Sequence, residues 1–350
     1  MTEGVPVASL AEARPRTGDR VFQGALVYTI ALTAFWLFFV VTRREGYFFQ
    51  HYSIDREGLM RVVSVFLVFS ILWGLVWYGV KSLLLKWLVG MPKEERRDVM
   101  GSRLDRPFDL DVILARYSER RIRIADMIGR RGRFLMMQMA GFAFLYARIA
   151  ANPSPDFLVL FLQDNLLDAV FLSWVALALY HSSGFLARMF YGAQSRIMDG
   201  KLARANCLII TTLWSGFKFV MVPLGVAIAA RFPPETYATV FILIWGCYTA
   251  ADGASEVVGS LFGKQKLEVW GVGDVNRKSL AGTWGGFLAA LAFALAVVLS
   301  QHLPGPWIAL AVVLATSSTL LELFSPRGTD DLTMATGNAL LCLAFGYFVY

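Results

Sequence analysis

Two carboxylates in the last third of the sequence have a spacing that suits metal chemistry. Asp252 closes an apolar stretch, 235–252, that is expected to be a helix, and Glu256 follows one turn later. If the helix continues for that turn, the two side chains share one face. A carboxylate at the negative, carboxyl-terminal end of a helix is unfavourable unless a cation binds it. Because Mg²⁺ takes one or two protein carboxylates and completes its shell with phosphate and water, the spacing predicts a magnesium site.

Basic residues follow these carboxylates along the chain. Lys264, Lys266 and Arg277 supply positive charge of the kind that a polyphosphate needs. Lys278 and Ser279 then open the next apolar stretch, and the free N–H groups at the amino end of a helix bind phosphate. This segment therefore predicts a phosphate-binding region.

A second acidic pair precedes the last apolar stretch. Asp330 and Asp331 lie just before 332–350, where either residue can cap a helix, serve as a further metal ligand or act as a base. An acidic metal site, cations and exposed helix amino ends on one membrane face are the parts that phosphoryl transfer requires. The pattern therefore favours phosphate chemistry.

Structural explanations are open for the same residues. The glycine pairs at 259–263 and 282–286 are G-x-x-x-G patterns, which are common where helices pack closely. The first carboxylate pair can likewise form interfacial ion pairs with Lys264 or Lys278.

Together these segments resemble the polyprenol kinase family, which groups dolichol kinase, phytol kinase and the CTP-dependent diacylglycerol kinases. That family is related to the phosphatidate cytidylyltransferases. Its pattern is an Asp followed by small residues, then G-K, K-S-x-x-G-[ST], a late Glu and D-N-L-T. The corresponding residues here, within 206–345, are Asp252, Ser255, Gly259, Gly263, Lys264, Lys278, Ser279, Gly282, Thr283, Glu322, Asp330, Asp331 and Thr333. Asp331 replaces the usual Asn of the family.

The resemblance implies a kinase that uses CTP with Mg²⁺ to phosphorylate a membrane lipid alcohol of the polyprenol, isoprenoid or diacylglycerol class. It assigns catalysis to Asp252, Glu322, Asp330 and Asp331, while the helix spacing described above lets Asp252 and Glu256 hold the metal. It assigns the nucleotide to Ser255, Gly259, Gly263, Lys264, Lys278, Ser279, Gly282, Thr283 and Thr333. Two alternatives stay open: a lipid cytidylyltransferase that makes a CDP-lipid, and a non-enzymatic transporter or scaffold.

The elements that must position these residues are membrane helices. The 350 residues are 57% hydrophobic and 17% charged, with a mean hydropathy of +0.55, which is typical of a chain dissolved in lipid. Stretches of about 20 apolar residues predict an all-α bundle of about nine spans. They lie at 21–41, 62–90, 134–151, 157–180, 206–230, 235–252, 280–300, 306–324 and 332–350.

Lys and Arg concentrate in alternate connections, and this pattern predicts the topology. The segments 91–133, 181–205 and 253–279 are basic, which places them and the amino terminus in the cytoplasm. The net charge of +7 is thereby explained without nucleic acid. We therefore expect a multi-pass protein of the bacterial inner membrane whose site faces the cytoplasm.

Three regions follow from this organisation. Residues 1–20 are expected to be a cytoplasmic tail, 21–205 a divergent membrane region, and 206–350 the catalytic membrane region. The charged stretch 105–130 predicts an amphipathic helix on the inner leaflet or, alternatively, a solvated helical hairpin.

The expected helix 157–180 carries two carboxylates of its own. Asp164 and Asp168 lie one turn apart, so they are expected either to form ion pairs with Arg148 or Lys218 or to contact a lipid hydroxyl.

Overall fold

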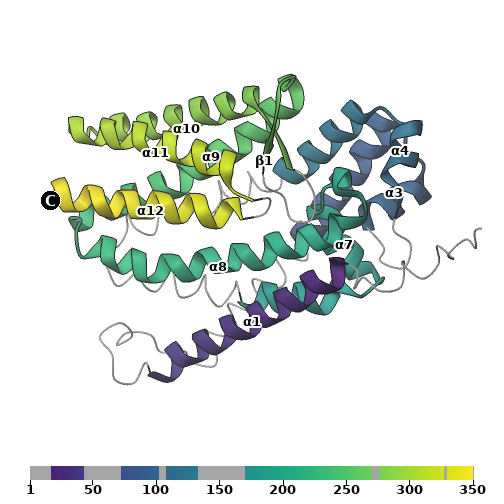
Figure 1. The fold of residues 1–350 in the computed structure, drawn as a ribbon, viewed down its shortest axis with the longest axis horizontal. Helices are drawn as coiled ribbons and strands as arrows, with labels where there is room; N and C mark the ends of the chain where they lie inside the picture. The colour runs from purple at the N-terminus through teal and green to yellow at the C-terminus, as the bar shows by residue number, and fades with distance from the viewer. Residues whose placement is uncertain are drawn as a thin grey trace, which may run out of the picture.

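Long helices make up most of the described chain, and one short hairpin lies among them (Figure 1). The computed structural model describes residues 17–42, 72–101, 108–132, 170–269, 276–326 and 329–349. Residues 72–84, 119–132 and 170–180 are helical. The remaining elements are α1 (Thr17–Thr42), η3 (Leu85–Val89), α3 (Lys93–Gly101), α4 (Leu110–Arg116), α7 (Phe185–Gln194), η4 (Ile197–Leu202), α8 (Ala203–Ala229), η5 (Pro234–Thr236), α9 (Tyr237–Phe262), β1 (Lys266–Val269), β2 (Asn276–Ser279), α10 (Leu280–Ser300), α11 (Gly305–Phe324) and α12 (Asp330–Val349).

Several of these helices are long and apolar enough to cross a bilayer. Helices 170–180 and 185–194 pass this test as a pair, although the chain bends by 117° between them. Five single helices also pass it: Gly18–Phe38, Leu72–Val89, Leu280–Ser300, Gly305–Phe324 and Asp330–Val349. The prediction of a helical, multi-pass membrane protein is confirmed to this extent.

The number of nine spans stays a prediction. Helices α8 and α9 occupy the expected positions 206–230 and 235–252. The expected helix 134–151 lies outside the described residues, as do Asp164 and Asp168.

A core of apolar side chains joins α8 to α12. Trp307 is fully buried, and its ring packs edge-on against Phe345 with the ring centroids 5.3 Å apart. One buried polar group crosses this core, because the amide of Asn338 donates to the Ser318 hydroxyl at 2.8 Å and to the Ile244 carbonyl at 3.3 Å. Since buried polar groups are costly without partners, these bonds fix α12 against α11 and α9.

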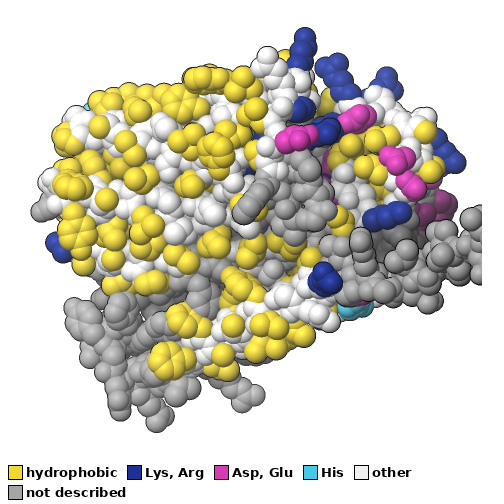
Figure 2. Space-filling model, in the orientation of Figure 1, with side chains coloured by type: hydrophobic (Ala, Val, Ile, Leu, Met, Phe, Trp, Pro, Cys, Tyr) yellow, Lys and Arg dark blue, Asp and Glu magenta, His cyan; other side chains and the backbone are white. Residues whose placement is uncertain are grey.

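Charged and apolar side chains occupy different parts of the surface (Figure 2). Most charged groups visible in this view gather around α3, α4 and the hairpin, while apolar side chains cover the helical bundle. The exposed apolar residues of α10 to α12 include Trp284, Leu288, Leu299, Ile308, Val312, Leu320, Leu340 and Phe348. An apolar surface of this extent is typical of helices that face lipid.

The basic stretch 105–130 forms two helices instead of one. The first helix, α4, ends at Arg116. The second helix, 119–132, begins after a short bend. Ile113 and Ile122 on these helices are buried in one apolar cluster, whose other members include Leu85, Val89, Met91, Val99, Met100 and Ile197. Protein side chains therefore cover part of this apolar face, while Val112 and Ile128 are exposed, so its position on the inner leaflet stays a prediction.

Helix α9 extends well beyond its predicted end. It continues from residue 252 to Phe262, and the chain that was expected to be a loop then forms the antiparallel pair β1–β2. This pair is the one sheet in the described ranges, and it is a small addition to a fold that is helical, as predicted.

Close packing of α9 on α10 explains glycines that the sequence left ambiguous. A Cβ atom on Gly282 would lie 2.6 Å from the carbonyl oxygen of Ser255, and a Cβ on Gly259 would lie 2.6 Å from the Ser279 hydroxyl. By contrast, a Cβ on Gly253 meets nothing within 4 Å. The G-x-x-x-G pattern therefore brings the two helix backbones together.

We expect Gly282→Ala to destabilise the protein by about 1–3 kcal/mol, because the new methyl group overlaps a backbone oxygen that must shift. Gly253→Ala is the matched control. It should be neutral or stabilising by up to about 1 kcal/mol, since alanine is the better helix former. The free energy of unfolding in mixed detergent micelles measures both effects, and equal values for the two variants would contradict this account of the glycines.

Candidate functional site

The first carboxylate pair lies inside α9, not at its end. Asp252 and Glu256 are one turn apart and precede the last helical residue, Phe262, by ten and six positions. The expected shared face is confirmed, because one guanidinium, that of Arg131, binds both carboxylates. The dipole argument for a cation at Asp252 is wrong, since the negative helix end lies further along the chain. The charge of the pair is balanced in another way.

Arginines from the amino-terminal half supply the opposite charge. Arg131 bonds both oxygens of Asp252, one of them at 2.7 Å, and its Nε also donates to Glu256. Arg130 donates to the other oxygen of Glu256, and Arg196 lies 3.7 Å from this carboxylate. Lys264 and Lys278 were the expected partners, and these arginines were not predicted from the sequence.

A buried ion pair holds the helix that carries the two arginines. Lys81, on helix 72–84, lies 2.6 Å from Asp126 and donates to the Ser195 carbonyl at 2.7 Å. Asp126 also accepts the backbone N–H of Ile197 at 3.0 Å. Helix 119–132 is thereby fixed, so Arg130 reaches α9 from a defined position.

The carboxylates keep both guanidinium groups charged. Burial lowers the pKa of Arg131, but the charges of Asp252, Asp330 and Asp331 outweigh burial and hold that pKa above its ordinary value. Burial and the nearby Arg196 and Arg131 cations lower the pKa of Arg130 to about 9. Arg130 is therefore also a cation at neutral pH.

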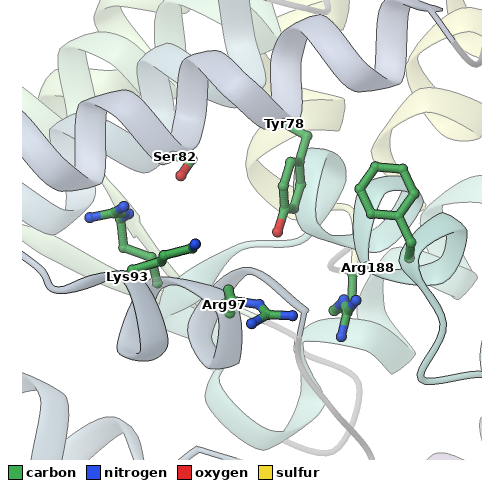
Figure 3. A pocket seen from close by; sticks show the side chains of 7 residues that line it. Tyr78, Ser82, Lys93, Arg97 and Arg188 are labelled. Atoms are coloured by element: carbon green, nitrogen blue, oxygen red, sulfur yellow. The ribbon is translucent and has the colours of Figure 1, made fainter.

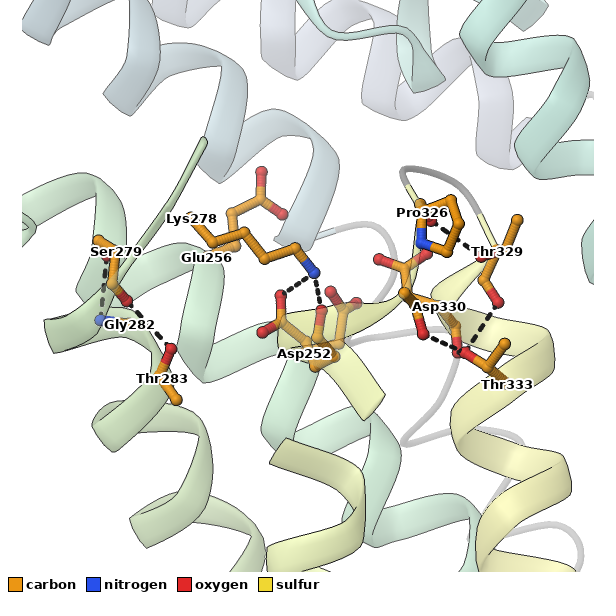
Figure 4. Close-up of polar contacts among 12 residues, drawn as sticks. Asp252, Glu256, Lys278, Ser279, Gly282, Thr283, Pro326, Thr329, Asp330 and Thr333 are labelled. Carbon is orange, nitrogen blue, oxygen red and sulfur yellow. Dashed lines mark hydrogen bonds and ion pairs between the residues drawn. The ribbon is translucent and has the colours of Figure 1, made fainter. Parts of the chain in front are cut away.

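The second acidic pair opens α12 and faces the first. Asp330 and Asp331 are the first two residues of that helix, where carboxylates interact favourably with the helix dipole. Asp331 lies close enough to Asp330 and Asp252 for their negative charges to repel one another. Figure 4 shows Asp330 and Asp252 on two helices that converge at this point. The structure therefore brings together acidic residues that the sequence placed in separate loops.

A separate ion pair joins the hairpin to α11. The Lys278 ammonium lies 2.9 Å from the Glu322 carboxylate and also donates to the backbone carbonyl of that residue (Figure 4). Glu322 also lies within electrostatic range of Asp252 and Asp330. The expected meeting of α9 with the amino ends of α10 and α12 is thus confirmed.

Several predicted nucleotide-binding residues have local structural roles. The Ser279 hydroxyl caps α10 by accepting the Gly282 N–H at 3.1 Å, and the Thr283 hydroxyl donates to the Ser279 carbonyl at 3.2 Å. Ser255 is buried where α9 packs on α10. For these positions a nucleotide role stays a prediction.

The other predicted nucleotide residues differ in exposure. Lys264 is exposed just after α9, while Gly263 packs so tightly that an added Cβ would lie 2.6 Å from the Ser279 hydroxyl. Thr333, in the first turn of α12, hydrogen-bonds the Ser325 hydroxyl and the Thr329 carbonyl. Thr333 thereby ties the α11–α12 connection to its helix.

The predicted magnesium ligands are only partly available for a divalent cation. Within the described ranges, no group of three or more His, Cys, Asp and Glu side chains has the arrangement of a metal site. Asp252 and Glu256 are bonded to arginines, whereas Asp330 and Asp331 form no ion pair with any described residue. The mutual repulsion of Asp252, Asp330 and Asp331 is the feature that a cation would relieve, and one or two carboxylates suffice for Mg²⁺.

A lipid kinase is among the characterised proteins that are similar to this chain. The chain is similar to a phytol kinase. It is 33% identical to the phytol kinase of Synechocystis sp. over 111 residues, which is 31% of this chain and 43% of that kinase. The chain thus spans less than half the length of the curated relative that it matches. No protein-family profile and no solved structure matches it.

Proposed function

We propose that this chain is a CTP-dependent kinase that transfers a phosphate to a membrane lipid alcohol, of the isoprenoid or diacylglycerol class, at the cytoplasmic face. One observation carries the proposal. Five carboxylates and four cations meet where α9, α10, α11 and α12 converge, beside the apolar surface of the bundle. The similarity to a phytol kinase supports the reaction class, and the alternation of basic loops supports the cytoplasmic side.

The charged groups divide into two sets with different tasks. Asp252, with Asp330 or Asp331, would hold Mg²⁺, which neutralises the charge of the polyphosphate when it is bound. Arg131 and Lys278 then bind phosphate oxygens, because each can exchange a carboxylate partner for the nucleotide. This arrangement keeps the cations in place before the donor arrives.

The transfer itself needs a base and an apolar approach for the acceptor. The hydroxyl oxygen of the lipid attacks the γ-phosphorus of CTP, so a new P–O bond forms as the bond to the β-phosphate oxygen breaks and CDP leaves. Glu322, whose carboxylate lies beside Lys278, accepts the hydroxyl proton. Exposed apolar residues of α10, such as Trp284 and Leu288, offer the lipid chain a surface next to the site.

The direct test is to incubate the purified chain with Mg²⁺, γ-labelled CTP or ATP, and a panel of lipid alcohols that includes phytol, a polyprenol and diacylglycerol. We expect label in one lipid phosphate, with CTP preferred and CDP as the second product. Pyrophosphate together with a CDP-lipid would identify a cytidylyltransferase instead. A folded, monodisperse protein that transfers no label to any acceptor would contradict the proposal.

The arginine bonds favour one second candidate, a membrane scaffold without enzymatic activity. Arg130 and Arg131 satisfy Asp252 and Glu256 as structural ion pairs do, and the glycines between α9 and α10 serve packing. In a scaffold the carboxylates would affect stability alone. In the kinase an isosteric change at Asp252 strongly slows phosphate transfer while the fold persists, and this difference separates the two functions.

A further inference from the structure

A basic pocket lies in the amino-terminal half of the chain, and none of its residues belongs to the acidic site. It is open to the surface and has a volume of about 350 Å³ between helix 72–84, α3 and α7 (Figure 3). Its lining consists of Tyr78, Ser82, Lys93, Arg96, Arg97, Phe185 and Arg188. Figure 3 shows the Tyr78 and Ser82 hydroxyls facing the basic side chains across this space.

The pocket is positively charged and therefore favours an anionic ligand. Four of the seven lining residues are cations and none is acidic. Arg97 approaches the exposed Glu94 at 3.8 Å, the one carboxylate within ion-pair distance of these four cations in the described ranges. Arg96 donates to the Met91 carbonyl at 2.6 Å, but its buried Nε has no hydrogen-bond partner. Because buried donors are costly without partners, this set is arranged for a ligand with several acceptor oxygens.

The walls of the pocket are fixed by close packing. A Cβ atom on Gly192 of α7 would lie 3.0 Å from the Tyr78 ring and would also overlap the Met100 carbonyl oxygen. At Gly192, α7 therefore packs directly on the backbone of α3 and on the Tyr78 ring of helix 72–84. The pocket is thus preformed, which lowers the entropic cost of binding.

The position of the pocket along its helix indicates a ligand from the membrane. Tyr78 and Ser82 lie within the candidate span Leu72–Val89, while the cations of α3 begin just beyond its end. Trp87 is 77% exposed near that end, and the Lys86 ammonium lies 5.0 Å from its ring centroid. Exposed Trp and Lys side chains are typical of the interface between lipid and water. Leu72, Val76 and Leu83 offer an exposed apolar surface on the same helix.

We propose that this pocket binds the phosphate of an anionic phospholipid headgroup, with Arg97 and Arg188 as its main ligands and the acyl chains along helix 72–89. A phosphate supplies the acceptor oxygens that the cations lack, and arginine binds it through two parallel N–H bonds. The exposed apolar surface on the same helix favours a lipid over a soluble phosphate. This assignment does not depend on the proposed kinase activity.

Native mass spectrometry of the full chain in detergent, titrated with phosphatidylglycerol or phosphatidylcholine, tests the proposal. We expect a preference for phosphatidylglycerol and a loss of its affinity by about tenfold or more in Arg97→Gln/Arg188→Gln. The variant Arg97→Lys/Arg188→Lys keeps the charge and should lose less. If the double Gln variant does not fold, Arg188→Gln alone should still weaken binding by about threefold.

The matched control removes the same charge outside the pocket. Arg120→Gln/Arg121→Gln alters two exposed arginines of helix 119–132 and should leave the affinity unchanged. An equal loss of affinity for phosphatidylglycerol in both double variants would show general attraction to anionic lipid and would contradict the assignment of the pocket. Unchanged binding in the pocket variant would contradict it as well. CTP and inorganic phosphate form a second arm of the titration. A pocket variant that loses affinity for these solutes but keeps phosphatidylglycerol would overturn the assignment to a lipid.

Discussion

Replacing Asp252 by asparagine is expected to slow CTP-dependent phosphorylation of a lipid alcohol by about 10²- to 10³-fold. The proposal gives Asp252 the task of holding Mg²⁺, and a neutral amide is a poor ligand for a hard divalent ion. Asparagine keeps the volume of the side chain and one oxygen that can accept from Arg131. The effect on activity should therefore exceed the effect on stability.

Single-turnover measurements of lipid phosphate formation, at several Mg²⁺ concentrations, give the required comparison. Glu268→Gln is the matched control, because this carboxylate lies on β1 of the neighbouring hairpin with its side chain 65% exposed. Its activity should stay within about twofold of the parent protein, since exposed ion pairs contribute little. Equal activity of Asp252→Asn and Glu268→Gln would favour the scaffold over the kinase.

The parts of the structure that local signals determine were predictable from the sequence. α10 begins at Leu280, directly after Ser279, because the serine caps the first turn and the apolar residues begin there. α11 ends at Phe324, as the apolar stretch indicated. The shared face of Asp252 and Glu256 followed from helix periodicity alone.

The length of α9 was not predictable in the same way. Gly253, Gly259 and Gly263 lower helix propensity, and the helix was expected to end at residue 252. In the structure α9 continues because its glycine face packs against α10, and the energy of this packing outweighs the local preference. Tertiary contacts of this kind are not visible in local composition.

The arginine partners of Asp252 and Glu256 were the most important feature of the site that was not predicted from the sequence. The two carboxylates indicated that a cation is needed, but Arg131 lies 121 residues before Asp252. A charge on one helix does not specify which distant cation will meet it, and many arginines were available in the basic segments. The identity of the partner is therefore a property of the fold, in particular of the Lys81–Asp126 pair that fixes helix 119–132.

Replacing Arg131 by methionine is expected to destabilise the protein by about 3–5 kcal/mol. The change leaves Asp252 with no bonded cation among the described residues, while Asp330 and Asp331 still repel it. Arg123→Met is the matched control, because the Arg123 side chain is 40% exposed and its guanidinium bonds Glu119 one turn away. Breaking that exposed pair should cost less than about 1 kcal/mol.

A second substitution and a metal titration test whether Arg131 balances the negative charge of Asp252. Adding Asp252→Asn to Arg131→Met should recover part of the loss, with a coupling energy of about 0.5–3 kcal/mol, because one unpaired carboxylate disappears. Mg²⁺ should raise the unfolding free energy of Arg131→Met, by about 2.7 kcal/mol at a hundredfold excess over its dissociation constant, but not that of the double variant. SDS titration in mixed micelles measures all of these values without any assay of activity. If Mg²⁺ still stabilises the double variant, the cation binds elsewhere. If Mg²⁺ does not stabilise Arg131→Met, the carboxylates bind arginine and no metal.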